Sequence, residues 1–250
     1  MSLDKLSITG LTLTLIIAAQ LAADDKLARD LVEKGIRAQG GRGALERFSG
    51  GSAKIKGRLH FLGDPLDFTG ELAMQGEDQH KIVIDTQVDG QKVRMTRSIN
   101  RDQAWNQINE QIEELEGDAL REAKEEAFTE WVSSLLPLNR PEFLLSLVGE
   151  TIIENRPAIG VNAAHEGHRD VNLYFDKGTG LLIKTETRVK EETTRQEITQ
   201  ETFLSDFKEV QNIKLPMKFV VKRDGKLLIV GEMLNYQRAE KLDDSIFAKP

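Results

Sequence analysis

The sequence has no cysteine and only two tryptophans, two tyrosines and six prolines among its 250 residues. Without cysteine the chain cannot form disulfides, thiolate nucleophiles, Cys-ligated zinc sites, iron–sulfur clusters or a lipid-modified N-terminal cysteine. Basic residues are also in deficit, because 34 Lys and Arg against 41 Asp and Glu give a net charge of −7. Nucleic-acid affinity depends on cationic surface, so we expect no nucleic-acid partner. Apolar residues make up 39% of the chain, which predicts a folded core.

Motifs for catalysis and for cofactors are equally scarce. The sequence contains no Gly-x-Ser-x-Gly and no P-loop. The densest group of potential metal ligands is His165-Glu166-Gly167-His168, which lacks the helical spacing of a zinc-protease motif and carries the glycine of a hairpin turn. We therefore expect no metal, no cofactor and no enzymatic activity. A metal-dependent enzyme using His165, Glu166 and His168 is the alternative.

Residues 1–23 have the pattern of an export signal. Asp4 and Lys5 are their only charges, an apolar run covers 11–19, and small residues precede Asp24. The run is short for a bilayer, since a spanning helix needs about 20 apolar residues. We expect a cleaved signal peptide over 1–23, a single domain over 24–250, and a periplasmic protein. An uncleaved N-terminal anchor and a cytoplasmic helix are the alternatives.

Hydrophobic spacing predicts one helix followed by many strands. Apolar residues recur every three to four positions over 24–39, and a period of two begins near Ile55. Asp89-Gly90 and Asp224-Gly225 predict two-residue hairpin turns. The first turn pairs Val88 with Gln91, Thr86 with Val93, Ile84 with Met95 and Ile82 with Arg97. The second pairs Val221 with Leu228, Phe219 with Val230 and Met217 with Glu232.

The fold class that follows is mainly β with α, a curved antiparallel meander of about eleven strands with an N-terminal helix. Residues 109–149 interrupt the meander as a helical insertion. A helix starts at Gly117-Asp118 and ends before Pro137, and a second short helix is expected from Pro141 to Gly149. The two helices would form a hairpin that lies as a lid on the apolar face of the sheet. That face is either a filled core or the wall of a cavity.

Three stretches carry a family resemblance, and they lie in the C-terminal third of the chain: 170–184, 203–216 and 242–247. They resemble the outer-membrane lipoprotein-carrier (LolA/LolB-like) superfamily. One departure is Asn212, which stands where the superfamily usually has glycine and which tolerates a positive φ. The resemblance implies a half-open antiparallel barrel closed by a helical lid, with an apolar concavity for acyl chains of lipids or lipoproteins. It also implies a membrane-associated donor or acceptor protein as a further partner.

The predicted function is therefore a periplasmic binding or carrier protein for acyl chains. The alternative is a non-catalytic envelope protein of the same fold, with a filled core, that acts through protein–protein contacts. The candidate wall residues are Phe61, Phe68, Leu72, Met74, Ile84, Met95, Phe175, Met217 and Phe219. The candidate residues beneath the lid are Phe128, Trp131 and Leu135.

Arg97 is the cation that the first hairpin places on an apolar strand face. The resemblance implies an arginine at the inner surface that holds the lid closed, so Arg97 is a candidate latch. A buried guanidinium needs partners for its five donors, and the carbonyls at the end of a lid helix would serve. Alternatively, Arg97 reaches water at a strand end or pairs with Glu232.

The net charge is concentrated in one segment. Residues 109–130 contain nine acidic and two basic residues, so the rest of the chain is neutral. The acids are Glu110, Glu113, Glu114, Glu116, Asp118, Glu122, Glu125, Glu126 and Glu130. We interpret them as the solvated outer face of an amphipathic helix. Alternatively, this face keeps the lid away from anionic membranes or docks it to a basic partner.

Overall fold

The computed structural model describes residues 7–48, 50–60, 63–191 and 194–250 of the chain. The helices in these residues are α1 (Ser7–Gln39), α2 (Arg42–Glu46) and α3 (Gly117–Ser133), with 3₁₀ turns at Leu136–Asn139 and Asp244–Phe247. The strands are β1 (Gly50–Leu59), β2 (Leu66–Gln75), β3 (Gln79–Val88), β4 (Gln91–Asn100), β5 (Gln103–Ile108), β6 (Gln111–Glu114), β7 (Phe143–Ile153), β8 (Arg156–His165), β9 (Val171–Asp176), β10 (Leu182–Lys190), β11 (Glu197–Val210), β12 (Ile213–Arg223) and β13 (Lys226–Ala239).

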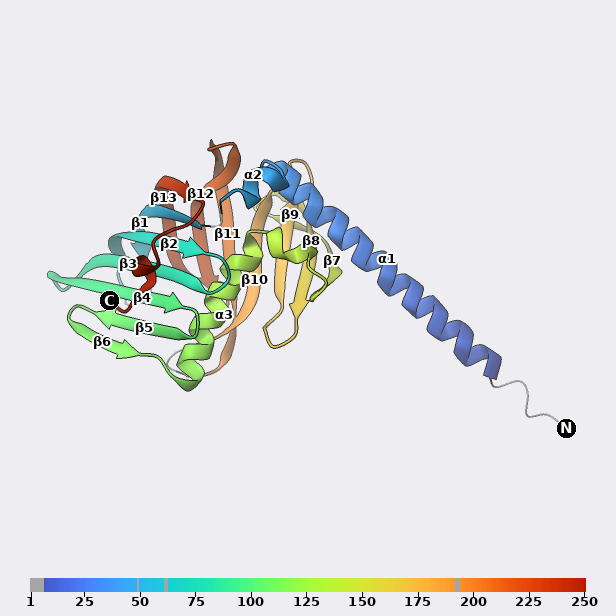
Figure 1. Cartoon of the computed structure of the whole chain (residues 1–250), viewed down its shortest axis with the longest axis horizontal. Coiled ribbons are helices and arrows are strands. Elements are labelled where there is room, and N and C mark those ends of the chain that lie inside the picture. The colour runs from blue at the N-terminus through green and yellow to red at the C-terminus, as the bar shows by residue number, and fades with distance from the viewer. Residues whose placement is uncertain (1–6, 49, 61–62, 192–193) are drawn as a thin grey trace.

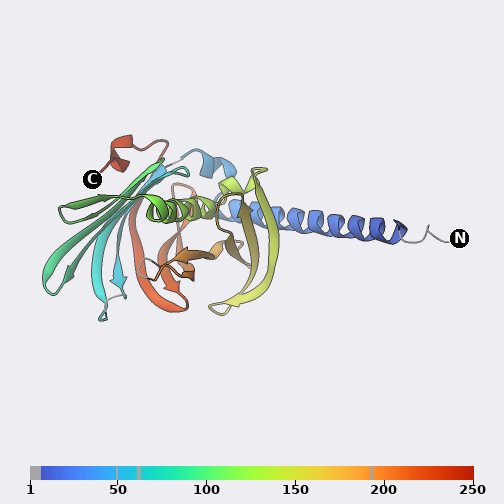
Figure 2. The ribbon, with the colours of Figure 1, turned by 90° about the horizontal axis from the view of Figure 1, so that it is seen from below.

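All thirteen strands belong to one antiparallel sheet. Its order is β6-β5-β4-β3-β2-β1-β13-β12-β11-β10-β9-β8-β7. Consecutive strands therefore pair, except for β6 and β7 at the two edges, and β1 pairs with β13. The sheet curls into a trough that does not close, and its two edge strands are β6 and β7 (Figures 1 and 2). The predicted curved meander is confirmed, with thirteen strands in place of about eleven.

The two predicted hairpins differ in how well their register was predicted. The β3–β4 register is as expected, since Ile84 pairs with Met95 and Ile82 pairs with Arg97. In the β12–β13 hairpin the turn at 224–225 is present, but Val221 pairs with Ile229 because a bulge shifts the register between Val221 and Lys222. The predicted pairing of Val221 with Leu228 is therefore wrong by one residue.

The predicted second lid helix is wrong. Residues 143–153 form β7, which pairs with β8 from Phe143 opposite His165 to Ile153 opposite Arg156. The consecutive apolar residues of this segment split between the two faces of an edge strand, with Phe143 buried and Leu144 71% exposed. Gly149 has a φ of 113° at a register shift within the strand, so it is a bulge residue and not a helix stop. The lid is consequently the single helix α3.

One end of the trough is filled by the main apolar core. Helix α1 packs there against β7, and the core includes Val32 and Ile36 of α1, Val132 of α3, and residues of β7 to β10. A second apolar cluster lies on the middle strands of the sheet, around Ile55 and Phe68 on β1 and β2. Several of its members face a part of the concave side that the main core does not fill.

Helix α1 is continuous over its 33 residues, so it extends from the core back through most of the predicted signal segment (Figure 1). Within the described part of the chain, no helix combines the length and the apolar character needed to cross a bilayer. Gly40 and Gly41 end α1 with φ values of 134° and 89°, and Gly41 N–H donates to the carbonyl of Ile36.

Candidate functional site

Helix α3 lies across the concave face of the sheet (Figure 2). It follows the edge strand β6 and precedes the edge strand β7 in the chain, so the connection between the two edges spans the open side of the trough. The predicted apolar stripe faces inward, with Ala123, Ala127, Phe128 and Val132 buried. In this position the rest of the protein covers the flanks of α3 as well as its apolar stripe.

A cavity of about 1070 Å³ lies between α3 and the sheet. This volume is at the upper end of the ~300–1,000 Å³ typical of small-molecule sites. Much of its wall is aliphatic or aromatic, contributed mainly by β1 to β3 and by β11 to β13. Representative wall residues are Ile55, Leu72, Ile82, Phe219, Ile229 and Met233. The concave face is therefore filled at the β7–β10 end and hollow beneath α3.

Several of the predicted site residues line this cavity. Leu72 and Met74 of β2, Phe219 of β12, and Trp131 of α3 all contribute to its lining. Arg97 of β4 lines it as well. The structure thus brings together residues from strands at opposite ends of the sequence, because β1 and β13 are adjacent in the sheet.

Three further predicted wall residues lie in the neighbouring apolar cluster. They belong to the same apolar cluster as Leu72, but they pack against their neighbours and do not line the cavity. These residues are Phe68, Ile84 and Met95.

The remaining predicted residues lie elsewhere. Phe128, Leu135 and Phe175 are buried in the main core, where Phe128 stacks on neighbouring rings, and none of them lines the cavity. Met217 is half-buried on β12 and is also absent from the lining. Phe61 is outside the described residues. Sequence periodicity identified the apolar face but did not separate core positions from cavity positions.

Arg97 connects the sheet to the lid helix. Its Nη1 donates to Glu126 Oε2 of α3 at 2.8 Å, and its Nε donates to Asn106 Oδ1 of β5 at 2.9 Å. Glu232, the alternative partner considered above, lies on β13 and pairs with Lys56. Burial alone would raise the pKa of Glu126. The charge and hydrogen bond of Arg97, together with the charges of His80 and Arg223, outweigh burial and hold this pKa below its ordinary value. Arg97 thus contacts α3 through an ion pair with a glutamate in the middle of the helix, and not through carbonyls at the helix end.

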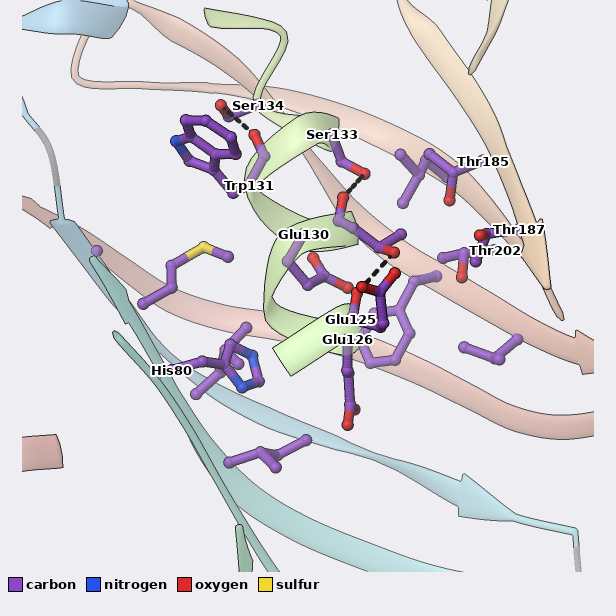
Figure 3. Close-up of a pocket in the computed structure, with 18 of the residues that line it drawn as sticks. His80, Glu125, Glu126, Glu130, Trp131, Ser133, Ser134, Thr185, Thr187 and Thr202 are labelled. Carbon is purple, nitrogen blue, oxygen red and sulfur yellow. Dashed lines mark hydrogen bonds between the residues drawn. The ribbon is translucent and has the colours of Figure 1, made fainter. Parts of the chain in front are cut away.

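Glu130 lies one turn after Glu126 and faces the cavity (Figure 3). Its carboxyl makes no hydrogen bond or ion pair with any residue of the described chain. The Glu130 side chain is solvent-exposed within the open cavity. The protein around it partly desolvates the carboxyl and raises the pKa of Glu130 to about 7, and the charge of Glu126 adds to this effect.

His80 of β3 faces the same part of the cavity (Figure 3). The residue is 5% exposed, and its Nδ1 has no hydrogen-bond partner in the described chain. Burial lowers the pKa of His80, so the imidazole is neutral at neutral pH. Thr185 and Thr202, which pair across β10 and β11, lie on the opposite side of this polar part of the cavity (Figure 3).

The other flank of α3 is fixed to the β8–β9 loop. Arg169 makes a two-pronged contact with Glu122, with N–O distances of 2.7 and 2.5 Å. Glu125 accepts from the backbone N–H of Arg169 at 3.0 Å and contacts His168 Nδ1 at 2.9 Å. Burial would raise the pKa of Glu122, but the hydrogen bonds and charges of Arg169 and Lys190 together hold it below its ordinary value.

These contacts correct the interpretation of the acidic segment. Three of the acids, Glu122, Glu125 and Glu126, do not belong to a solvated outer face, because they contact Arg169, His168 and Arg97. Glu130 is exposed, as predicted, and lines the open cavity. The earlier acids at 110, 113, 114 and 116 are exposed. Docking of this segment to a basic partner stays a prediction for those earlier residues alone.

The histidines at 165 and 168 have structural contacts. The predicted turn is present, with the His168 N–H donating to the carbonyl of His165 at 3.1 Å. The His168 ring stacks on Phe128 with centroids 3.7 Å apart, and the His165 ring lies 4.9 Å from that of Phe143. No group of three His, Asp or Glu side chains in the described residues is arranged to hold a metal ion.

Sequence analysis missed Glu130 and His80 as cavity residues, although a signal for Glu130 was present. Glu130 follows the buried Ala123 by seven residues, and an α-helix drifts only about 20° over seven residues. The two residues are therefore on nearly the same side of α3. His80 precedes Ile82 by two residues and Ile84 by four. Because side chains alternate between the two faces of a strand, His80 lies on the same apolar face as these two residues.

A curled, open antiparallel sheet with a helix across its concave face and a cavity beneath that helix is a LolA-like fold. No protein-family model and no curated protein matches the chain. Among solved structures, a DUF1329 family protein from Desulfovibrio piger has a TM-score of 0.56 at 11% identity, covering 88% of this chain and 97% of that one.

Two further structures agree on the fold. A LolA superfamily protein from Nitrosomonas europaea has a TM-score of 0.55 at 12% identity, covering 89% of this chain and 97% of its own. An outer membrane lipoprotein-sorting protein domain from Vibrio parahaemolyticus has a TM-score of 0.53 at 10% identity, covering 87% and 97%. The fold that the sequence resemblance implied is thus confirmed.

Proposed function

We propose that the protein is a non-catalytic binding or carrier protein of the cell envelope that holds acyl chains of a lipid or lipoprotein in the cavity beneath α3. The cavity of about 1070 Å³ with its largely apolar wall is the observation that carries this proposal. The lipoprotein-sorting domain among the structural neighbours and the signal-like residues 1–23 support it.

The energetics favour an acyl chain as the occupant. Each methylene moved from water into an apolar environment contributes about 0.8 kcal/mol, so ten methylenes contribute about 8 kcal/mol before the cost of association. The wall is already formed by paired strands, so binding does not require the sheet to be ordered first.

Binding is tested on the purified full chain with N-phenyl-1-naphthylamine, a neutral apolar fluorophore whose emission rises in apolar surroundings. Organic extraction followed by mass spectrometry tests in parallel for lipid retained during purification. We expect saturable fluorescence and co-purified lipid. A protein that binds no probe and retains no lipid would refute the proposal and leave the protein–protein alternative.

A matched pair of variants locates the binding. Leu72→Glu places a charge in the cavity wall, whereas Leu144→Glu places the same charge on the exposed side of β7. Because a charge in an apolar site is costly, we expect Leu72→Glu to weaken probe binding by about tenfold or more and Leu144→Glu to leave it unchanged. Equal binding by wild type and Leu72→Glu would contradict this location.

A further inference from the structure

The two edges of the sheet differ in how far their outer backbone groups are covered. Helix α1 partly covers β7, because Leu145 N–H donates to Asp25 Oδ1 at 3.4 Å and Arg29 Nη2 donates to the carbonyl of Phe143 at 2.8 Å. Strand β6 pairs with β5 alone, and no other part of the described chain hydrogen-bonds its backbone. All four residues of β6 are exposed, so β6 is the open edge of the sheet (Figure 1).

The register of the β5–β6 hairpin shows which backbone groups are free. Ile108 and Gln111 flank the two-residue turn, so they exchange backbone hydrogen bonds. Because such pairs alternate along an antiparallel ladder, Ile112 and Glu114 direct their N–H and C=O groups away from β5. The Leu115 N–H, one residue further on, donates to the carbonyl of Ala104 at 2.8 Å, as this alternation requires.

The side chains along this edge are apolar and acidic. Ile108 is 55% exposed and Ile112 is 41% exposed, on opposite faces of the hairpin. The carboxylates at 110, 113, 114 and 116 are also exposed, and none forms an ion pair with the described chain. No basic residue lies between 109 and 116. The edge therefore offers backbone pairing, apolar contact and uncompensated negative charge at one place.

The charge selects the partner. Pairing of β6 with the same strand of a second copy would set carboxylates opposite carboxylates, and like charges directly opposite one another destabilise a sheet. An extended segment that carries lysine or arginine would instead form cross-strand ion pairs in addition to hydrogen bonds with the open edge.

We propose that β6 is a docking edge for a basic, extended segment of a partner protein, which adds to the sheet as a further strand. The inference goes beyond the proposed function and does not depend on what the cavity holds. Only residues 115 and 116 separate β6 from α3. The docked segment would thus bind next to the start of the helix that covers the cavity.

Three capped peptides of about seven residues, long enough for one strand, test the docking. The first alternates lysine and valine, the second lysine and proline, and the third glutamate and valine. The second keeps the charge of the first but cannot pair as a strand, since proline has no N–H. We expect the lysine–valine peptide to bind the full chain about tenfold or more tightly than the other two. Titration calorimetry at low salt, where surface charges are little screened, measures the affinities.

Two substitutions at one position separate the backbone from the side chain. Ile112→Pro removes an outward N–H without removing a bond to β5, and Ile112→Ala removes only the apolar side chain. We expect Ile112→Pro to weaken binding of the lysine–valine peptide by about tenfold and Ile112→Ala to weaken it less.

A charge-matched pair of variants tests the selection of a basic partner. Glutamine at 110, 113, 114 and 116 should weaken binding of the lysine–valine peptide by about tenfold or more. The control carries glutamine in place of four exposed glutamates near the opposite edge and should bind as wild type does. These glutamates are Glu142, Glu150, Glu154 and Glu166.

Amide hydrogen exchange of the wild-type chain distinguishes strand addition from charge attraction. The N–H groups of Ile112 and Glu114 should become protected when the lysine–valine peptide is present. The docking is overturned if they stay unprotected, or if the lysine–proline peptide binds equally well. These two measurements need no variant, so they decide the docking even if Ile112→Pro fails to fold.

The two proposals fail separately. Ile112 does not line the cavity, so Ile112→Pro should bind N-phenyl-1-naphthylamine as wild type does. A wild-type chain that binds this probe but not the lysine–valine peptide overturns the docking and leaves the carrier function standing. A chain that binds the peptide but not the probe supports the docking and refutes the carrier function.

Discussion

Glu130 makes the stability of the free protein depend on pH in a predictable direction. Its pKa is raised from 4.5 to about 7 in the folded protein. The folded state therefore binds a proton at this site more tightly than the unfolded state does. As pH rises from about 4.5 to about 7, the folded state loses that advantage and its free energy of unfolding falls. Above about pH 7 the loss is complete.

The size of the effect follows from the same values. At 1.36 kcal/mol per pH unit, the difference between 4.5 and about 7 sets a ceiling of about 3 kcal/mol. Water in the cavity screens the Glu130 carboxylate, so we expect about 1–2 kcal/mol. Glu130→Gln should remove the effect, because the amide stays neutral and the carboxyl has no partner to lose. The variant should be more stable than wild type by this amount above about pH 7 and about equally stable below pH 4.5.

Urea unfolding, followed by tryptophan fluorescence at about pH 5 and about pH 8, measures the effect. Glu142→Gln is the control, since it removes the same charge from an exposed position. The reasoning is refuted if Glu130→Gln and wild type differ by the same amount at both pH values. It is also refuted if the variant is less stable at about pH 8.

Three other substitutions probe the scaffold by urea unfolding. Gly57→Ala should destabilise the folded protein by about 1–3 kcal/mol, because the added Cβ would meet the Val230 carbonyl oxygen. Gly43→Ala, with open space around it, should not destabilise the protein, and equal effects of the two substitutions would contradict this reasoning. Arg169→Leu should cost about 2 kcal/mol by releasing α3 from the β8–β9 loop, and a loss below about 0.5 kcal/mol would show that this pair is not structural. Asn212 has a φ of 67°, so Asn212→Val should lower the free energy of unfolding by about 1–2 kcal/mol and Asn212→Gly should be tolerated. A more stable Val variant than Gly variant would contradict the argument that this turn requires a positive φ.

The parts of the fold that were predictable depend on local chemistry. Asp89 and Gly90 adopt φ values of 50° and 78°, so their residue types fixed both the turn and the register of β3 and β4. The turn at Asp224 also formed, but the bulge beyond it arises from pairing between strands and has no local signature. The segment containing Phe143 was mistaken for a helix because a short apolar run is ambiguous, and only its pairing with β8 decides the outcome.

The candidate site was predictable to a smaller extent. Alternation placed Leu72, Met74 and Phe219 on the correct face, since a period of two is a property of the backbone. Whether a residue on that face lines a cavity or fills a core depends on where the helices lie, which is a tertiary property. Glu122 and Glu125 were assigned to solvent because a helix on a surface has one polar side, but this flank of α3 is covered by the β8–β9 loop.

The continuity of α3 with both edge strands limits how a ligand can enter. The helix is joined to β6 on one side and, through a short 3₁₀ turn, to β7 on the other. It therefore cannot swing away as a flap that is hinged at one end. Any displacement of α3 from the sheet must break the contacts of Arg97 or Arg169, or change the separation of β6 and β7. Loading that moves α3 therefore either breaks these ion pairs or changes the curvature of the sheet.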